Sequence, residues 1–535
     1  MSDIMLMDCT LRDGGFINKW NFGHGDMVNL FERAVSAGID YIEVGFLDSR
    51  EPFDINRSIT PDTKGMDRLF ENLDHGNSKI FAMIDYGTCP IENISDAKDS
   101  VIDGIRVMVK KKTRFEALKF CGELKKKGYM VFVQPVSITG YSDEEMTDLV
   151  KHINELDPFA MSIVDTYGLL DQSNLIHYYD LINGLLNKNV ALGYHAHNNF
   201  QLAYSNSIAL CERKSDRTLL LDGSAYGMGK SAGNCPLELL VMYANSHMGK
   251  HYDISQILEM IDTGIMKIYE KNPWGYQLQY FLCASNDCHP KYAQHLLKKK
   301  TLSIRSIDEI LKQIRKEDRL AFNEEYIEEL YLKYQNNEIS DERAKKLFAE
   351  EIGDEEVLII GPGRSIEKKR DVVVDHIAQN APVIISINYI PDRIAVKYIF
   401  ISNSKRYMQL GSKLTEYKGK IKTLATSNVT PAKGSFDHSF DYTSLIDPDF
   451  EIPDNSLPML LRLLKNIGIK RVSLAGFDGY VPEKNANYAD STMEYEFVKD
   501  YAIKLNDYTK NVIKQLRADK DMEIKFITES EYEEH

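Results

Sequence analysis

The chain has 535 residues, which is too long for one ordinary domain and predicts two or three domains. With 43% hydrophobic and 27% charged residues, its composition is typical of a globular protein with enough material for a large core. The net charge of -15 argues against a nucleic-acid-binding surface, because such a surface usually needs a basic patch.

The sequence shows no sign of export or membrane insertion. No run of about 18 apolar residues is present, so no membrane-spanning helix is expected. The N-terminus lacks the basic segment and the long apolar stretch of a signal peptide. The seven cysteines are scattered, and none forms a CxxC pair. Scattered thiols are typical of a reducing compartment, and we expect a cytoplasmic protein with no membrane partner.

From residue 1 to about residue 250, short β-rich runs alternate with amphipathic helical runs such as residues 25–38 and 144–156. The candidate strands are Ile4–Met7, Tyr41–Val44, Lys79–Ile84, Gly104–Val109, Met130–Pro135, Phe159–Val164, Val190–Tyr194 and Thr218–Leu221. Eight strands alternating with helices over this length predict an α/β fold of the (β/α)8 TIM-barrel type for residues 1–250. A doubly wound open sheet is the alternative.

The rest of the chain divides in two. Residues 251–345 carry several amphipathic patterns and predict a helical extension. At about residue 350 a new alternation of strands and helices begins, and the acidic stretch 348–356 is the expected linker. The pattern predicts a Rossmann-like α/β domain over residues 350–535.

In the barrel, candidate catalytic residues are sought where strands end, because barrel active sites lie at that face. Arg12 and Asp13 follow the first strand, and His195 and His197 lie at the end of the seventh. Alternate residues of a strand share a face, so both imidazoles can point to one place. Together with the Asp13 carboxylate they could hold a divalent metal with open positions. A purely structural histidine pair is the alternative.

The eighth strand is followed by a glycine-rich loop that ends at Asn234. The GKS within this loop is not a P-loop, because Ser224 stands where the first glycine is required. Glycines such as Gly229 are more typical of a backbone that comes close to a substrate or a metal.

The segments DCTLRDGG, HAHNN and GMGKSAGN, in this order on a barrel, resemble the metal-dependent pyruvate aldolases and lyases, within about residues 3–290. That superfamily includes 4-hydroxy-2-oxovalerate aldolase, hydroxymethylglutaryl-CoA lyase and the isopropylmalate and homocitrate synthases. The resemblance implies that Asp13 and both histidines hold Mn²⁺ or Mg²⁺, with Asn234 as a further ligand, as in the lyases. It also implies that Arg12 polarises the enolate oxygen and that Glu43 orients Arg12.

One position departs from the aldolase pattern. Those aldolases carry a histidine general base four residues after the arginine, and Phe16 stands there in this chain. Tyr167, Tyr226 or a metal-bound water could serve instead, and Tyr167 is our candidate catalytic residue. The Claisen-type synthases carry a Glu soon after the aspartate, and its absence here disfavours the acyl-CoA branch.

Polar residues at two further strand ends could bind the substrate. Gln134 lies near the end of the fifth strand and Ser137 follows it, and Thr166 comes after the sixth. These residues and the backbone at Gly229 are our candidate substrate contacts. A merely polar loop is about as good an explanation for Gln134 and Ser137, and a structural role is the alternative for Thr166.

In the C-terminal domain, a strand is followed by Gly361, Gly363 and Ser365, a turn that can direct helix N–H groups toward a phosphate. The third glycine of a dinucleotide fingerprint is missing. Asn388 and Asp478 lie at other strand ends, where such sheets bind ligands. The pattern resembles Rossmann-like domains that handle sugars or nucleotides, including the sialyltransferase-type fold. A domain used only for packing or dimerisation is the alternative.

The expected activity is a metal-dependent aldol reaction between pyruvate, or a similar 2-oxo acid, and an aldehyde. A sugar-binding second domain would place it in surface-polysaccharide or sugar metabolism. The alternatives are a Claisen-type acyl-CoA lyase or synthase, and a non-catalytic barrel that supports a nucleotide- or sugar-binding domain. We also expect a homodimer, and the resemblance allows a partner dehydrogenase.

Overall fold

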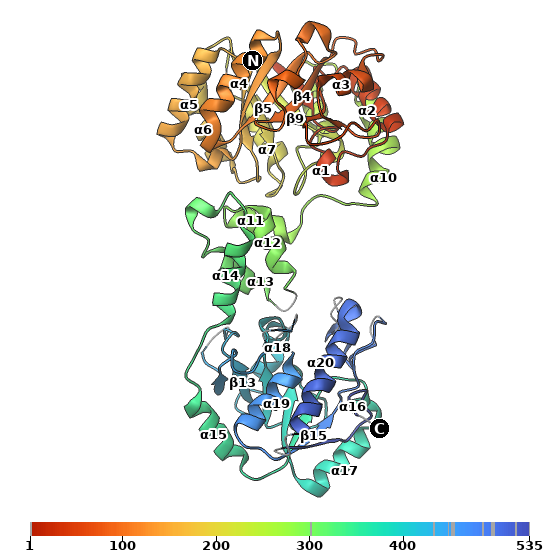
Figure 1. Cartoon of the computed structure of the whole chain (residues 1–535), viewed down its shortest axis with the longest axis vertical. Helices are drawn as coiled ribbons and strands as arrows, with labels where there is room; N and C mark the ends of the chain where they lie inside the picture. Colours follow the sequence, from red (N-terminus) through yellow and green to blue (C-terminus); the bar gives the residue numbers. More distant parts are fainter. Residues whose placement is uncertain are drawn as a thin grey trace. The chain divides into compact units, whose positions relative to one another are not determined.

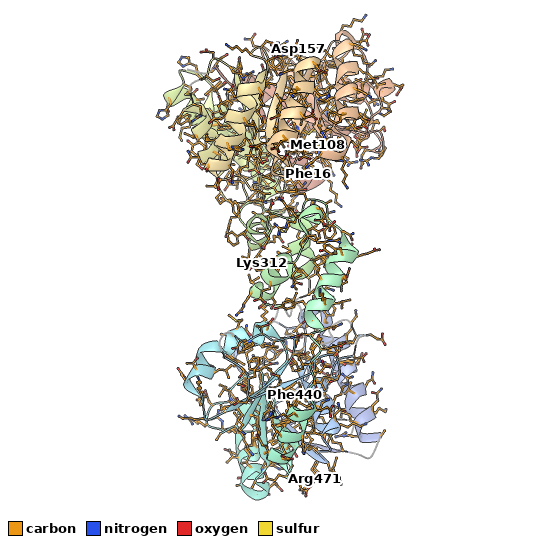
Figure 2. The ribbon with its side chains drawn as sticks, turned by 90° about the vertical axis from the view of Figure 1, so that its left-hand side faces the viewer. Phe16, Met108, Asp157, Lys312, Phe440 and Arg471 are labelled. Atoms are coloured by element: carbon orange, nitrogen blue, oxygen red, sulfur yellow. The ribbon has the colours of Figure 1, made fainter. Side chains whose placement is uncertain are left out.

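The computed structural model describes residues 3–213, 215–299, 302–431, 434–447, 449–450, 455–483, 486–493, 498–518 and 522–533. The chain forms two compact units (Figures 1 and 2). The first consists of Met1–Ala293 together with Arg315–Phe322, and the second of Gln294–Ile314 together with Asn323–His535.

The first unit is built on a closed barrel of parallel strands. These strands are β1 (Ile4–Asp8), β2 (Tyr41–Leu47), β4 (Lys79–Asp85), β5 (Gly104–Val109), β6 (Met130–Pro135), β7 (Ala160–Asp165), β8 (Ala191–Ala196) and β9 (Leu219–Gly223). They are hydrogen-bonded in the order β1-β9-β8-β7-β6-β5-β4-β2, and β1 also pairs with β2, which closes the sheet. Closure confirms the predicted (β/α)8 barrel and excludes the open sheet. The short strand β3 (Ile59–Thr60) pairs with the end of β2.

Helices surround this barrel, and the longer ones each bury an apolar stripe. The helices of this unit are α1 (Gly15–Asn18), α2 (His24–Ser36), α3 (Thr63–Phe70), α4 (Arg114–Lys126), α5 (Asp143–Leu156), α6 (Gln172–Leu185), α7 (Ala203–Cys211), α8 (Leu237–His247), α9 (Ile254–Met260), α10 (Met266–Tyr269) and α11 (Leu278–Ser285). In α2 the buried residues Met27, Leu30, Phe31 and Ala34 recur at helical spacing. Helix α5 begins with a capping box formed by Ser142 and Glu145.

The barrel interior is apolar toward the start of its strands and polar toward their ends. Tyr41, Phe81 and Phe132 pack edge to face inside it. Polar side chains follow later along the strands, where a barrel carries its active site. Figure 2 marks the two ends of the barrel, since Phe16 follows β1 and Asp157 precedes β7.

The second unit contains an all-parallel sheet with the order β14-β13-β12-β11-β10-β15-β16. Its strands are β10 (Val357–Ile360), β11 (Val383–Ile387), β12 (Tyr398–Ile401), β13 (Lys422–Thr426), β14 (His438–Phe440), β15 (Arg471–Ala475) and β16 (Glu523–Phe526). Its helices are α13 (Ile304–Leu311), α14 (Glu324–Gln335), α15 (Glu342–Ile352), α16 (Ser365–Lys368), α17 (Arg370–Asn380), α18 (Ser404–Glu416), α19 (Ser456–Asn466) and α20 (Val498–Ala518), while α12 (Pro290–Leu297) runs from the first unit into the second.

Both faces of this sheet are buried. Along β10, Val357 and Ile359 belong to one apolar cluster, and Leu358 and Ile360 belong to another. Alternate residues of a strand point to opposite faces, so the sheet has a core on each side. The strand order reverses between β10 and β15, as in doubly wound folds. This sheet confirms the predicted C-terminal α/β domain.

Two predictions about the chain as a whole can be compared with the structure. Across the described residues, the helices are all too short or too polar to cross a membrane. The seven cysteines all lie in the described part of the chain, where each is buried and unbridged.

Candidate metal centre

Three possible metal ligands meet at the carboxyl ends of β1 and β8, which are separated by β9. Asp13 follows β1, His195 lies in β8, and His197 comes directly after β8. One ligand atom from each of them lies within 4.8 Å of the others, and the two imidazole centroids are 5.2 Å apart. All three side chains are buried. The sheet order explains the meeting, because β9 pairs with both β1 and β8.

Asn234 lies beside this group, and two buried atoms there lack hydrogen-bond partners. Asn234 forms an isolated bridge with His197. Within the described part of the chain, neither the Asn234 Oδ1 nor the His197 Nδ1 has a hydrogen-bond partner. Buried polar atoms are rarely left unpaired, so two orphaned acceptors beside a carboxylate are typical of a site that holds a cation. The residues present therefore fit a divalent metal.

The protonation states also suit a metal. Burial lowers the pKa of His197 to about 3, so its imidazole is neutral near pH 7, as a ligand must be. Burial would raise the pKa of Asp13, but Arg12 and the two histidines outweigh burial and hold that pKa well below its usual range. The group therefore offers a charged carboxylate and at least one neutral imidazole.

A second group of possible ligands, Cys9, His195 and Asp222, shares one histidine with the first. Burial raises the pKa of the Cys9 thiol well above its ordinary value, and a thiol must lose its proton to bind a metal. The Asp222 carboxylate already accepts hydrogen bonds from Arg106 and from His195. The first group is therefore the better candidate.

Gly229, in the loop after β9, lies so close to two candidate ligands that only glycine fits at this position. A Cβ atom on Gly229 would lie 2.5 Å from the Asn234 Nδ2 and 2.6 Å from the Asp13 Oδ2. Distances this short are not tolerated, so any larger residue would displace two of the candidate ligands.

A chain of buried polar contacts connects one candidate ligand to another around the barrel interior. We call it the charge chain, and its members in order are Asp13, Arg12, Glu43, Arg106, Asp222 and His195. Arg12 binds the Asp13 Oδ1 through Nη1 at 2.5 Å and the Glu43 Oε2 through Nε at 2.7 Å. Arg106 donates from Nη1 to the same Glu43 oxygen at 3.0 Å. The His195 Nδ1 lies 2.9 Å from the Asp222 Oδ2, which leaves the Nε2 for a metal.

The charge chain holds three carboxylates and two guanidinium groups, so it carries one net negative charge when His195 is neutral. Burial lowers the pKa of Arg106, but Asp222 and Glu43 outweigh burial and raise it above its usual range. A buried excess charge is costly unless a counter-ion compensates it. Lys230, whose ammonium is attracted to Asp13, offsets part of this charge, and a cation held by Asp13 would offset more of it.

Arg12 retains one donor that the charge chain does not use. Within the described residues, its buried Nη2 has no hydrogen-bond partner. The other two nitrogens are fixed by Asp13 and Glu43, so the position of the guanidinium plane is determined. A fixed donor of this kind can stabilise negative charge that develops on a substrate oxygen.

Arg106 and Asp222 were not predicted as site residues. Each interrupts an otherwise apolar strand, Arg106 in β5 and Asp222 in β9. A charged residue in the middle of a buried strand is itself a signal, because lone buried charges are rare. That signal could have identified Arg106, whereas Asp222 follows the predicted strand Thr218–Leu221 and belongs with the polar residues at strand ends.

The other predicted barrel residues lie at strand ends, where each makes a hydrogen bond to a residue of the neighbouring strand or just after it. The buried Gln134 donates from Nε2 to the Ser162 Oγ at 2.8 Å. The backbone N–H of Ser137 donates to the Thr166 Oγ1 at 2.7 Å. Their part in substrate binding stays a prediction.

Tyr167, our candidate base, has its hydroxyl engaged in the structure. The hydroxyl donates to the carbonyl oxygen of Leu320 at 3.1 Å, and burial raises its pKa to about 12. The ring lies 5.3 Å from that of His289 and 5.6 Å from the Lys230 Nζ. Tyr167 thus joins the barrel to residues of the helical extension, and its catalytic role stays a prediction.

In the second unit, the turns after β10 and β15 lie against each other. The carboxylate of Asp478 accepts from the backbone N–H of Ser365 at 2.9 Å and from its hydroxyl. A Cβ atom on Gly361 or Gly363 would lie 2.5 or 2.6 Å from the carbonyl oxygen of Gly476, so both positions require glycine. Four of the five predicted residues are therefore neighbours, and Asn388 lies at the end of β11.

Taken together, a closed parallel barrel with a carboxylate, two imidazoles and a fixed guanidinium at its strand ends defines the class of TIM barrels with a candidate metal centre. Within that class, residues 3–263 match the HMGL-like family model, and this part of the chain is an HMGL-like domain. The resemblance inferred from the three motifs is confirmed for this part.

Several proteins of known name are similar to the same half of the chain. An oxaloacetate decarboxylase of Mycobacterium tuberculosis is 24% identical over 277 residues, which cover 50% of this chain and 80% of that protein. A 4-hydroxy-2-oxovalerate aldolase of Shewanella halifaxensis is 23% identical over 278 residues, which cover 49% of this chain and 78% of that protein. The crystal structure of an HMG-CoA lyase from Brucella melitensis aligns with a TM-score of 0.41 and 15% identity, covering 49% of this chain and 96% of the other.

Proposed function

We propose that the barrel is a divalent-metal-dependent lyase that makes or breaks the C–C bond between pyruvate, or a similar 2-oxo acid, and an aldehyde. The observation that carries this proposal is the unused buried donor of Arg12 beside the group of Asp13, His195 and His197. Cleavage or formation of a bond next to a 2-oxo acid passes through an enolate, whose oxygen needs positive charge and a donor. The HMGL-like domain and the aldolase relatives support the same proposal.

The roles of the residues follow from their contacts. Asp13, His195, His197 and Asn234 would hold the ion, and Mn²⁺ or Mg²⁺ is our expectation. When bound, such an ion supplies Lewis-acid stabilisation of negative charge on the keto oxygen. Arg12 donates to the same developing charge, and Glu43 keeps the guanidinium in place through the bond to Nε.

Decarboxylation of oxaloacetate is a second candidate activity, and Phe16 favours it. Aldol cleavage needs a base that removes the proton of a hydroxyl group, and the position of the expected histidine base is occupied by Phe16. Loss of CO₂ from a 2-oxo diacid gives a pyruvate enolate without such a base. The similarity to an oxaloacetate decarboxylase supports this candidate.

The aldol candidate predicts that the protein forms an enolate from pyruvate, which can be tested without the aldehyde. The protein is incubated with pyruvate in D₂O with Mn²⁺ or Mg²⁺, and the methyl proton signal is followed by NMR. We expect metal-dependent exchange of C–H for C–D, lost in Asp13→Ala and His195→Ala but retained in His177→Ala, which changes an exposed histidine of α6. Bound metal without exchange would contradict the aldol candidate with pyruvate as the 2-oxo acid. Turnover of oxaloacetate, measured separately, tests the decarboxylation candidate.

A further inference from the structure

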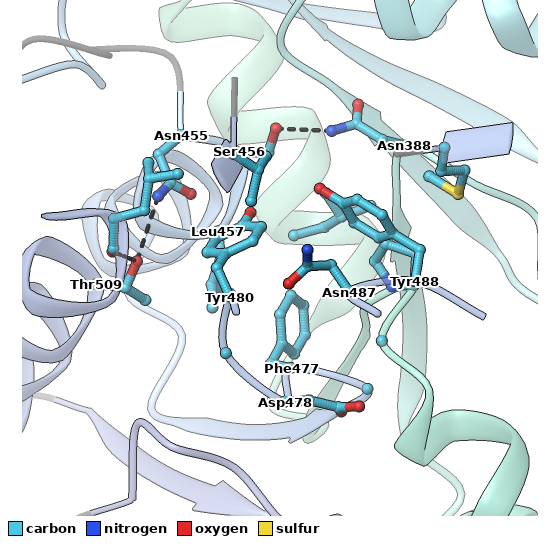
Figure 3. A pocket seen from close by; sticks show the side chains of 18 of the residues that line it. Asn388, Asn455, Ser456, Leu457, Phe477, Asp478, Tyr480, Asn487, Tyr488 and Thr509 are labelled. Carbon is cyan, nitrogen blue, oxygen red and sulfur yellow. Dashed lines mark hydrogen bonds between the residues drawn. The ribbon is translucent and has the colours of Figure 1, made fainter. Parts of the chain in front are cut away.

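The second unit contains a cavity at the carboxyl ends of β10, β11, β12 and β15 (Figure 3). It lies where the strand order reverses, between the turns that follow β10 and β15. Open parallel sheets bind their ligands in the crevice at this position. Gly363, Asn388 and Asp478 of the predicted C-terminal site line the cavity, and Gly361 and Ser365 support the turn beside it.

Asn388 presents an unsatisfied acceptor in the cavity wall. Only 9% of this residue is exposed, and its Nδ2 donates to the Ser456 Oγ at 2.7 Å (Figure 3). Within the described part of the chain, the Asn388 Oδ1 has no hydrogen-bond partner. Its backbone has a φ of 59°, a conformation that is costly for most residues and recurs at binding sites. A ligand that donates a hydrogen bond, such as a hydroxyl group, would satisfy this oxygen.

The N-terminus of α19 lies in the same wall without a side-chain cap. Its N-cap residue, Asn455, makes no side-chain capping bond, and its Nδ2 donates to the Thr509 Oγ1 at 3.3 Å (Figure 3). Ser456 and Leu457, the first two residues of this 11-residue helix, both line the cavity. Their N–H groups precede the first intrahelical bonds, and a helix N-terminus of this kind attracts an anion.

The charged residues among those described in the cavity wall are Arg406 and Asp478. Arg406 is 4% exposed, and its guanidinium lies 5.3 Å from the centroid of the Tyr488 ring. The Asp478 carboxylate is turned toward Ser365, whose N–H and hydroxyl it accepts. The cavity therefore combines a buried cation with an uncapped helix N-terminus, and both favour an anionic ligand.

Aromatic rings provide the rest of the wall. Phe477, Tyr480, Tyr488 and Tyr532 line the cavity, and the first three are labelled in Figure 3. Rings of this kind bind flat or ring-shaped groups by stacking and by apolar contact. The wall thus offers three kinds of contact, for an anion, for a hydroxyl donor and for a ring.

We propose that this cavity binds the phosphate ester of a sugar, either a free sugar phosphate or the ribose phosphate of a nucleotide. The phosphate lies at the N-terminus of α19 near Arg406, a sugar hydroxyl donates to the Asn388 Oδ1, and the ring contacts the tyrosines. This site is separate from the barrel and does not depend on the proposed aldol chemistry.

The test measures binding to the full-length protein by isothermal titration calorimetry. The probes are the 5′-monophosphates of uridine, cytidine, adenosine and guanosine, glucose 1-phosphate, and inorganic phosphate. We expect at least one ester to bind, and to bind more tightly than inorganic phosphate. Preference for a nucleoside monophosphate would identify a nucleotide site, and preference for glucose 1-phosphate a sugar phosphate site.

Two variants examine the geometry. Asn388→Gly removes the unsatisfied oxygen but tolerates the positive φ, and Arg406→Gln removes the cation. Each should weaken binding of the ester by about tenfold or more, because each removes a buried hydrogen bond or a charge partner. The matched control is Arg393→Gly, which changes a residue with a φ of 64° that does not line the cavity. Circular dichroism confirms that the variants fold.

Three results would overturn the proposal. The first is that none of the esters binds. The second is that inorganic phosphate binds as tightly as every ester. The third is that folded Asn388→Gly and Arg406→Gln proteins bind the best ester as tightly as the Arg393→Gly control.

Discussion

At the scale of single residues, Arg12 has three tasks that a lysine cannot perform together. Its planar fork binds Glu43 and Asp13 and leaves one buried nitrogen for a substrate. In Arg12→Lys, we expect the rate of pyruvate exchange to fall by about 10²–10³-fold, the usual effect of losing one such donor. Bound metal, measured by elemental analysis, should remain near one per chain.

The control for this variant is Arg213→Lys, at an exposed position where Arg213 pairs with Asp180. It should exchange pyruvate at the wild-type rate. If Arg12→Lys also kept that rate, the guanidinium would have no role in stabilising the enolate.

The next prediction concerns Gly229, where a substitution acts through steric clash and leaves the charge of the site unchanged. The added methyl group in Gly229→Ala would collide with Asn234 and Asp13. We expect the affinity for Mn²⁺ to fall by about tenfold or more, as it does when ligand positions are disturbed. Gly25→Ala is the matched control, because a Cβ there meets no atom within 4 Å and the residue lies in helix α2. Equal Mn²⁺ affinity in both variants would argue against these ligands.

The buried carboxyl of Asp165 should make the stability of the folded protein depend on pH. This buried carboxyl accepts the N–H groups of Leu169 and Leu170, and burial raises its pKa from 3.8 to about 7. The protonated form is therefore favoured by folding, so its contribution to stability is present below pH 3.8 and is lost as the pH rises through about 7.

The corresponding variant is Asp165→Asn, which cannot titrate. We expect its free energy of unfolding, relative to the wild type, to rise between pH 5 and pH 8, as measured by urea denaturation of the metal-free proteins. A difference that stays constant with pH would show that Asp165 does not titrate in this range.

At the scale of elements, the charge chain connects strands that hydrophobic packing alone would not fix. Arg106 on β5 reaches Glu43 on β2 and Asp222 on β9. Removing one partner of a buried pair leaves an uncompensated charge, so Arg106→Met should lower the free energy of unfolding by about 3–5 kcal/mol. Lys79→Met is the control, since the exposed Lys79–Asp103 pair should contribute less than about 1 kcal/mol. If the two variants lost the same free energy of unfolding, a structural role for the charge chain would be contradicted.

Most barrel elements could be predicted because each strand is an apolar run of the right length. The strands at 104–109 and 130–135 have the predicted bounds, while β8 and β9 each run two residues further than predicted, to Ala196 and Gly223. These extensions include Asp222 and bring His195 inside a strand. The apolar pattern in the sequence ends before these polar residues. The strands extend beyond that point because their backbones continue to form hydrogen bonds with the neighbouring strands.

The candidate metal ligands could be predicted from the sequence, but the long-range contacts that hold them in place could not. Asp13, His195 and His197 stand in motifs at strand ends, where a single sequence gives a signal. The partners of Arg106 lie 63 and 116 residues away, and only the closed barrel brings them together. The bond from Tyr167 to Leu320 spans 153 residues and depends on how the extension folds back on the barrel.

At the scale of the whole molecule, the two units have separate hydrophobic cores. We therefore expect two transitions in calorimetry, of which Mn²⁺ raises only the one that belongs to the barrel. At a concentration 100 times the dissociation constant, binding should stabilise this unit by about 2.7 kcal/mol. The shift should vanish in His195→Ala. A single transition that moves as a whole with Mn²⁺ would show that the units do not unfold independently.

The net negative charge of the charge chain has a consequence for kinetics. The carboxylate of a 2-oxo acid is repelled by this buried charge until a divalent cation has reversed its sign. Binding therefore follows a preferred order, and pyruvate should bind the metal-free barrel more weakly than the metal-loaded barrel, because the unused donor of Arg12 alone cannot replace the cation. Steady-state rates measured against both reactants should show an ordered pattern in which the cation is the leading reactant, and inhibitors that mimic the 2-oxo acid should be uncompetitive toward it.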